Sequence, residues 1–123
     1  MGTSGKGEVL IVEDDEGIRE AMRLMLELEG YRVATASNGK EGLDALERRQ
    51  APCVILLDLM MPVMDGWEFA EAIQKRPALS RIPLYVVTAF TDRTKPLPGA
   101  LGVLNKPVEI DVLLSTVDRY CGI

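Results

Sequence analysis

The sequence predicts a doubly wound α/β fold, in which a parallel sheet is covered by helices on both faces. Short apolar runs that suit buried strands alternate with segments whose apolar residues recur at helical spacing. Polar side chains directly follow several of these apolar runs. Strand–helix alternation of this kind favours a parallel sheet with helices on both sides.

The first half of the chain is predicted to hold two strands and two helices. Residues 9–12 form a continuous apolar run, VLIV, that suits a strand buried on both faces. Apolar residues then recur at helical spacing, at Ile18, Met22, Met25 and Leu26. Gly30 ends this helix in the usual way for a C-terminal glycine. A second strand is expected at residues 32–36, then a turn at 37–39 and a helix that ends near Arg49.

The second half is predicted to supply three further strands and two helices. The strands are expected at residues 53–57, 84–87 and 103–104, and the last helix at about 109–120. Asp65 and Gly66 open the other helix, and Pro77 stops it. The proline-containing stretch 90–101 is expected to be irregular.

Five strands in this pattern suit the flavodoxin-like fold, with strand order 2-1-3-4-5. We expect a loose tail at residues 1–7 and one domain over residues 8–123. The chain contains no internal repeat and no linker, and we expect no attached effector domain.

The composition is that of an ordinary globular domain, with 47% hydrophobic and 27% charged residues. No apolar run approaches the length that spans a bilayer, and no segment has the pattern of a secretory signal. A net charge of -5 without a basic face argues against nucleic-acid binding. The absence of histidine excludes the usual zinc sites and histidine-based triads.

The sequence contains two cysteines, Cys53 and Cys121. A small secreted scaffold held by disulfides would carry more cysteines at tighter spacing. We therefore interpret both as reduced thiols in a cytoplasmic protein.

Polar residues of interest share one position, the end of a predicted strand. Glu13 and Asp14 follow the first strand, Asp58 the third, Thr88 the fourth and Lys106 the fifth. Alone, each has an ordinary explanation, as a helix cap or a surface side chain. Ligands of open parallel sheets bind outside the carboxyl ends of the strands, near the point where strand order reverses, so these residues predict one cleft.

The chemistry of this cleft matches phosphoryl transfer. Clustered carboxylates repel one another and need a counter-charge, and an oxygen-rich site suits Mg2+. A protonated lysine can bind an anion, and a threonine hydroxyl adds a donor. Metal and ammonium together can neutralise phosphoryl oxygens while a carboxylate attacks.

The sequence resembles the receiver domain of two-component response regulators. The matching stretches are VLIVEDDEGIRE, VILLDLMMPVMDGWE, PLYVVTA and GALGVLNKP, in order and at family-like spacing. The resemblance implies that Asp58 is the phosphoacceptor, that Glu13, Asp14, Asp58 and the carbonyl of Met60 hold Mg2+, and that Thr88 and Lys106 contact the phosphoryl group. It also implies a cis Lys106–Pro107 bond and leaves Asp15 outside the metal site.

Two departures from the family pattern concern signal output. Val103 stands where the family commonly has an aromatic residue, three positions before the lysine. The stretch from Thr88 to Lys106 is about four residues shorter than usual and contains Pro96 and Pro98. We therefore expect the fourth family helix to be shortened or irregular, and the output surface to be unusual.

Three functions compete. The leading one is a phosphoacceptor switch that receives its phosphoryl group from a histidine kinase or histidine phosphotransfer protein and acts on an unknown protein target. Such a switch is no enzyme beyond catalysing its own phosphorylation and dephosphorylation. The alternative is a degenerate receiver that binds a protein without phosphorylation. The third is a phosphatase of the haloacid dehalogenase type. Such an enzyme needs a second acid two residues after the nucleophilic aspartate, where this chain has Met60.

Overall fold

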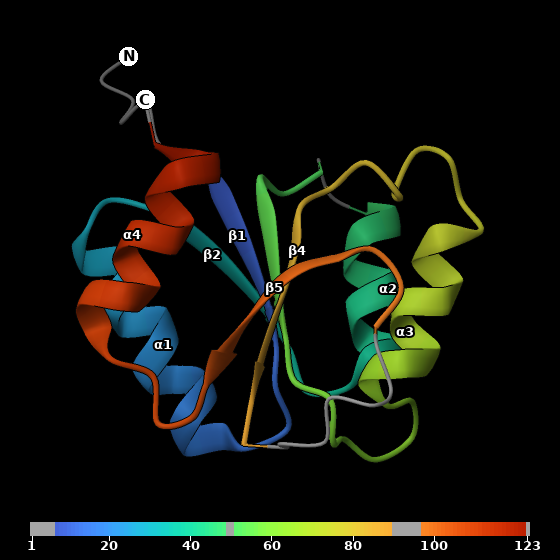
Figure 1. Cartoon of the computed structure of the whole chain (residues 1–123), viewed down its shortest axis with the longest axis horizontal. Coiled ribbons are helices and arrows are strands. Elements are labelled where there is room, and N and C mark those ends of the chain that lie inside the picture. Colours follow the sequence, from blue (N-terminus) through green and yellow to red (C-terminus); the bar gives the residue numbers. More distant parts are fainter. Residues whose placement is uncertain (1–6, 49–50, 90–96, 123) are drawn as a thin grey trace.

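The computed structural model describes residues 7–48, 51–89 and 97–122 (Figure 1). The described strands form a single parallel sheet in the order β2-β1-β3-β4-β5, which confirms the flavodoxin-like topology predicted from the sequence. The strands are β1 (Glu8–Val12), β2 (Arg32–Ala36), β3 (Val54–Leu57), β4 (Leu84–Thr88) and β5 (Ala100–Asn105). The predicted tail at residues 1–7 lies outside the described residues, except for Gly7.

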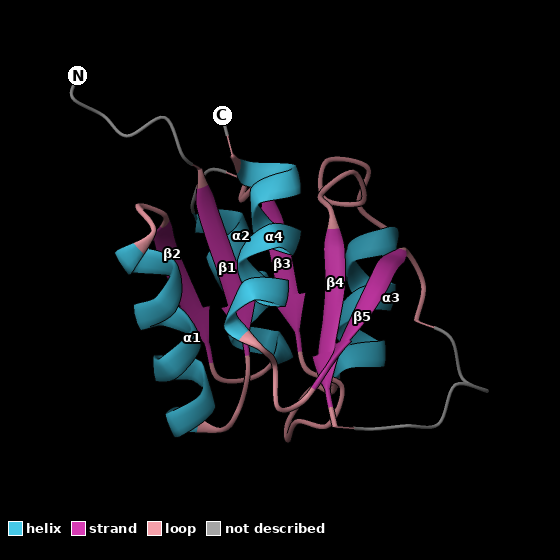
Figure 2. Ribbon diagram, turned by 60° about the vertical axis from the view of Figure 1, so that its left-hand side comes forward, coloured by secondary structure: helices cyan, strands magenta, loops and turns pink. Residues whose placement is uncertain are grey.

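Four helices in the described part of the chain cover the two faces of the sheet. They are α1 (Glu16–Leu28), α2 (Gly39–Arg48), α3 (Gly66–Gln74) and α4 (Ile110–Cys121). Helices α1 and α4 lie on one side, and α2 and α3 lie on the other (Figure 1, Figure 2). In the described part of the chain, no helix is both long and apolar enough to cross a membrane.

The continuous apolar run of β1 is explained by burial on both faces. Val9 and Ile11 pack in the core beneath α1 and α4, whereas Leu10 and Val12 pack beneath α2 and α3. Successive strand residues point to opposite faces, so a central strand needs an apolar residue at every position. Full burial of each such side chain contributes about 1.5–3 kcal/mol, which anchors β1 at the centre of the sheet.

The first and third helices begin at side-chain caps that the sequence encodes. Asp15 accepts a hydrogen bond from the Ile18 amide at 2.9 Å, and this bond caps α1. Asp65 and Glu68 form a reciprocal capping box at the start of α3. Asp15 lies in the loop after β1 and Asp65 in the loop after β3. The two caps therefore fix where α1 and α3 begin, at the carboxyl ends of the strands.

The last strand is longer than the sequence predicts. We expected only residues 103–104, but β5 spans Ala100–Asn105. The prediction was wrong because the irregular, proline-containing stretch was expected to extend to residue 101. In the structure Gly99 has a positive φ and precedes the strand, and Gly102 lies within it. A Cβ at Gly102 would lie 2.6 Å from the ring of Tyr85, so the glycine makes room for that ring. Most of the segment expected to hold an irregular fourth family helix, residues 90–96, lies outside the described residues.

The cysteine interpretation was also wrong, because Cys53 and Cys121 form a disulfide. Cys53 precedes β3 and Cys121 is the last residue of α4, with their Cα atoms 5.3 Å apart. Their separation of 68 residues hides this proximity, which arises only when α4 packs back across the sheet. The bond ties the end of the chain to the edge of the sheet opposite the polar strand ends.

We predict that reduction of this disulfide destabilises the domain. A cross-link across a loop of this length lowers the entropy of the unfolded chain, which contributes about 4 kcal/mol. The midpoint of urea unfolding should therefore fall when a phosphine reductant is added. The variant Cys121→Ser should match the reduced protein and show no response to reductant. An unchanged midpoint in the original chain would contradict the disulfide and favour free thiols.

Candidate functional site

The predicted site residues meet at the carboxyl edge of the sheet. Glu13 follows β1, Asp58 follows β3, Thr88 ends β4 and Lys106 follows β5. Glu13, Asp58 and Thr88 are the buried polar or charged residues of the described chain, with 2%, 6% and 2% of their surface exposed. Buried charges are costly without partners, so their concentration at one edge indicates a functional site.

The backbone ladder of the sheet continues one step past each strand and places these residues. The Glu13 amide donates to the carbonyl of Ala36 at 3.0 Å. The Asp58 amide donates to Val12, and the Lys106 amide donates to Thr88, each at 3.0 Å. Strand register therefore fixes the backbone at these residues, and with it the positions of their side chains.

Three carboxylates form a group that can hold a divalent cation. Glu13, Asp14 and Asp58 each offer an oxygen, and these atoms lie within 4.8 Å of one another. Asp14 is exposed, whereas the other two are buried, so the group opens to solvent on one side. An all-oxygen set that is partly open to water suits Mg2+, which keeps several of its waters. The residues present therefore fit the ion that the sequence predicts.

Lys106 supplies the positive charge inside this acidic group. Its Nζ lies 2.5 Å from Oε1 of Glu13 and 3.4 Å from Oδ2 of Asp58. Desolvation by burial opposes charging of the ammonium, but the hydrogen bond to Glu13 and the charge of Asp58 outweigh it and raise the pKa of Lys106. For Glu13, which is more deeply buried, desolvation dominates and raises the pKa of the carboxyl, although Lys106 lowers it.

Gly66 lets α3 begin directly against the loop that follows Asp58. Its amide donates to the carbonyl of Leu59 at 2.9 Å. A Cβ at this position would lie 2.7 Å from the carbonyl oxygen of Asp58 and 2.8 Å from Cα of Leu59. Backbone atoms cannot move aside cheaply, so a side chain here would displace Asp58. From the sequence, Gly66 was expected only to start a helix.

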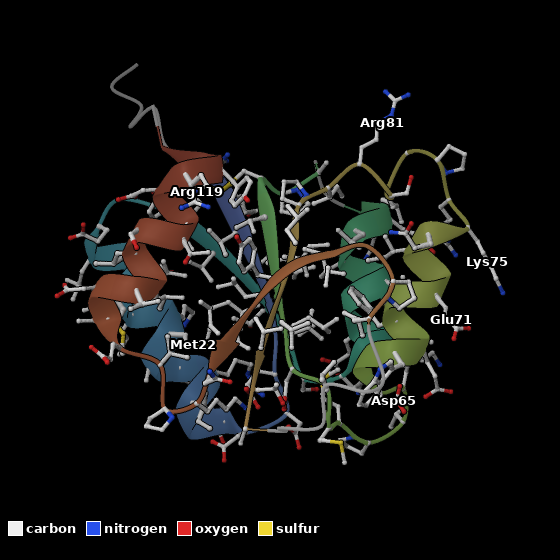
Figure 3. All side chains as sticks on the ribbon, in the orientation of Figure 1. Met22, Asp65, Glu71, Lys75, Arg81 and Arg119 are labelled. Atoms are coloured by element: carbon white, nitrogen blue, oxygen red, sulfur yellow. A yellow bond between two sulfur atoms is a disulfide. The ribbon has the colours of Figure 1, made fainter. Side chains whose placement is uncertain are left out.

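An apolar pocket of about 440 Å3 adjoins the site between α1 and α4. Met22, which is labelled in Figure 3, lines it together with Leu113. Lys106 and Pro107 form the wall toward the acidic group, and the bond between them is cis, as the family resemblance implied. The lysine therefore contacts both the polar site and an apolar surface.

Arg19 is the side chain at this site that the sequence analysis missed. It lies on α1, and its Nη1 donates to the carbonyl oxygen of Glu13 at 2.9 Å. No spacing of residues predicts this contact, because a side-chain hydrogen bond to a backbone carbonyl leaves no pattern in the residue types. Met60, expected to offer its carbonyl to Mg2+, follows Asp58 by two residues and is 58% exposed. Its role as a ligand stays a prediction.

Comparison with known proteins identifies the family. The profile of the response regulator receiver domain matches residues 9–118. The chain belongs to this family. An uncharacterized 14.6 kDa protein of Leptolyngbya boryana is 37% identical to this receiver domain, over 98% of this chain and 95% of that protein. The transcriptional regulatory protein AfsQ1 of Streptomyces coelicolor is 38% identical over 85% of this chain, which spans only 47% of AfsQ1.

A solved structure supports the comparison at the level of the fold. The receiver domain of the sensor histidine kinase PA1611 from Pseudomonas aeruginosa superposes with a TM-score of 0.85 at 27% identity. The match covers 96% of this chain and 99% of that one. That structure is described as having a magnesium ion coordinated in its active-site cleft.

We predict that Lys106→Met destabilises the metal-free receiver domain by about 3 kcal/mol at pH 7, because it leaves buried carboxylates without a counter-charge. The loss should shrink as the pH falls. The pKa of Glu13 is already raised above its ordinary value of 4.5, and removing Lys106 raises it further. Between pH 4.5 and the raised pKa of the variant, Glu13 is protonated in the folded protein but ionised in the unfolded chain. The stability of the variant therefore increases as the pH falls through this range.

The matched control is Lys75→Met, which removes an exposed lysine that points away from the sheet at the end of α3 (Figure 3). Urea unfolding between pH 5 and pH 8 measures both variants. Equal stability curves for the two variants would show that Lys106 does not neutralise the acidic group.

Proposed function

We propose that this receiver domain is a phosphoacceptor switch that takes a phosphoryl group onto Asp58. The proposed donor is a histidine kinase or a histidine phosphotransfer protein. The observation that carries the proposal is the setting of Asp58. This carboxylate is buried at the centre of the carboxyl edge, 3.4 Å from the Lys106 ammonium and beside two further acids.

The acidic group supports a role for Mg2+. Glu13, Asp14 and Asp58 would hold the ion, with the backbone carbonyl of Met60 as a further ligand. When bound, the ion neutralises charge on the phosphoryl oxygens. Two features favour this assignment, the spacing of the three carboxylates within 4.8 Å and the magnesium in the cleft of the PA1611 receiver domain.

The residues of the chain supply the remaining requirements of the transfer. A carboxylate oxygen of Asp58 attacks phosphorus and forms a P–O bond, while the P–N bond of the donor phosphohistidine breaks and its electron pair returns to the imidazole. Lys106 already contacts Asp58 and can pair with a phosphoryl oxygen. Thr88, buried at the end of the neighbouring strand, provides a hydroxyl donor. This chemistry makes the chain its own catalyst, and we propose no other substrate.

Phosphorylation of Asp58 is proposed to change the conformation of the domain, and a protein target detects this change. Val103 replaces the aromatic residue that the family commonly has, and it is 37% exposed on β5. The signal is therefore proposed to leave the site without the usual aromatic side chain.

A cytoplasmic location follows from the proposed donor, whose phosphoryl group derives from ATP. Disulfides are uncommon in that compartment. Cys121 is 5% exposed and Cys53 is half-buried, so thiols have limited access to the bond. Limited access slows reduction, which reconciles the disulfide with the proposed location.

We predict that incubation with acetyl phosphate and Mg2+ adds one phosphoryl group to the chain, as measured by intact-mass spectrometry. Asp58→Asn should abolish the gain, because an amide oxygen is a poor nucleophile. Asp15→Asn is the matched control, since this neighbouring acid caps α1 and asparagine caps as well. Labelling of Asp58→Asn to the level of the original chain would overturn the proposal. No labelling by either a small-molecule donor or a phosphorylated kinase would favour the degenerate binding module.

A further inference from the structure

Arg19 connects helix α1 to the backbone of the acidic turn. Its Nη1 donates to the carbonyl oxygen of Glu13 at 2.9 Å and lies 3.5 Å from the carbonyl oxygen of Asp14. One guanidinium group therefore contacts two successive peptide groups. These two residues supply carboxylates to the metal group described above.

The geometry of α1 explains how the side chain reaches the turn. The Arg19 amide donates to the carbonyl of Asp15 at 2.9 Å, so Arg19 lies in the first turn of the helix. Helical side chains tilt toward the helix N-terminus, which places the guanidinium beside the turn that enters α1. Arg19 is half-buried as a residue. It also lies near enough to Glu41 of α2 to help lower the pKa of that carboxyl, after the hydrogen bonds from Ser37.

The turn between β1 and α1 has three residues, and each is anchored differently. The Glu13 amide extends the sheet by donating to Ala36, and the Asp15 amide donates to Oε2 of Glu13 at 3.0 Å. Asp14 carries an exposed side chain. Among the contacts seen in the described residues, the carbonyl oxygen of Asp14 is contacted by Arg19. Removing Arg19 should therefore free the Asp14 peptide first.

We propose that Arg19 is a positioning residue that holds the backbone of Glu13 and Asp14 in the conformation that binds Mg2+. The proposal rests on the proposed function of the site, since it assigns a role to Arg19 in the same metal group. Hydrogen bonds to a charged donor are strong, and the planar guanidinium can bond to two acceptors at once. The turn then binds the ion without first paying the entropy of ordering.

The direction in which Arg19→Ala changes the Mg2+ affinity distinguishes a positioning role from a purely electrostatic one. Arg19 is a cation near a cation-binding site, so removal of its charge alone would strengthen Mg2+ binding. Loss of an ordered turn would weaken it. Groups that orient metal ligands typically contribute roughly 10- to 100-fold to metal affinity. A weaker affinity in Arg19→Ala therefore cannot result from the lost charge.

The test compares Arg19→Ala with Arg23→Ala, which removes the same charge one turn further along the same helix. Arg23 pairs with Glu20 and Glu27, at 2.5 Å and 2.7 Å, and the structure gives it no contact with the acidic turn. Mg2+ affinity is measured by isothermal titration calorimetry. Amide hydrogen exchange is measured by NMR in the metal-free proteins. Urea unfolding reports stability, and Arg19→Lys replaces Arg19→Ala if that variant does not fold.

We expect Mg2+ to bind Arg19→Ala roughly tenfold more weakly. The affinity of Arg23→Ala should stay within about twofold, because the charge of Arg23 is already paired with Glu20 and Glu27 and salt screens what remains. In the metal-free proteins the Asp15 amide should exchange faster in Arg19→Ala but not in Arg23→Ala. Both contacts come from the single nitrogen Nη1, and a lysine ammonium keeps the charge on a more flexible side chain, so Arg19→Lys should keep at least part of the affinity that Arg19→Ala loses.

Each failure has a distinct meaning. Unchanged or tighter Mg2+ binding in Arg19→Ala would overturn the proposal. Unchanged exchange of the Asp15 amide would overturn it even if no variant binds the ion. Faster exchange in Arg19→Ala together with no Mg2+ binding by the original chain would uphold the positioning role and contradict the proposed function of the site.

Discussion

The contact between the Lys106 ammonium and the buried carboxylates of Glu13 and Asp58 is the interaction on which the rest of the site depends. Two carboxylates with 2% and 6% exposure repel one another and lose hydration. Lys106 offsets both costs from the end of β5, at 2.5 Å and 3.4 Å. The raised pKa of Glu13 shows that the compensation is incomplete, because burial still outweighs the lysine. An acidic site kept in this state retains an affinity for further positive charge.

Strand register is the constraint that brings these groups together. Glu13, Asp58 and Lys106 each occupy the position directly after a strand, where one more ladder hydrogen bond fixes the backbone. A slip by one residue would turn each side chain to the opposite face of the sheet. The two apolar cores prevent the slip, because the central strands are buried on both faces. Packing far from the site therefore determines its geometry.

The residue types alone predicted the strand order and the meeting of Glu13, Asp58, Thr88 and Lys106, because buried strands and strand ends leave clear patterns. Contacts that depend on how side chains pack in three dimensions left no such pattern in the sequence. The length of β5 depends on how Gly102 receives the ring of Tyr85, and the disulfide depends on where α4 ends in space. The hydrogen bond from Arg19 to a backbone carbonyl is equally invisible in the sequence. These features follow from tertiary packing, which no local spacing encodes.

The central claim is that one site holds both the divalent cation and the phosphoryl group. A crystal structure of the protein with Mg2+ and beryllium trifluoride, a mimic of a phosphoryl group on a carboxylate, tests it most directly. We expect the beryllium on the Asp58 carboxylate, its fluorines contacted by Lys106 and Thr88, and Mg2+ against Glu13, Asp14 and Asp58. Beryllium on another side chain, or Lys106 still paired with Glu13 and no ion among the carboxylates, would contradict the account.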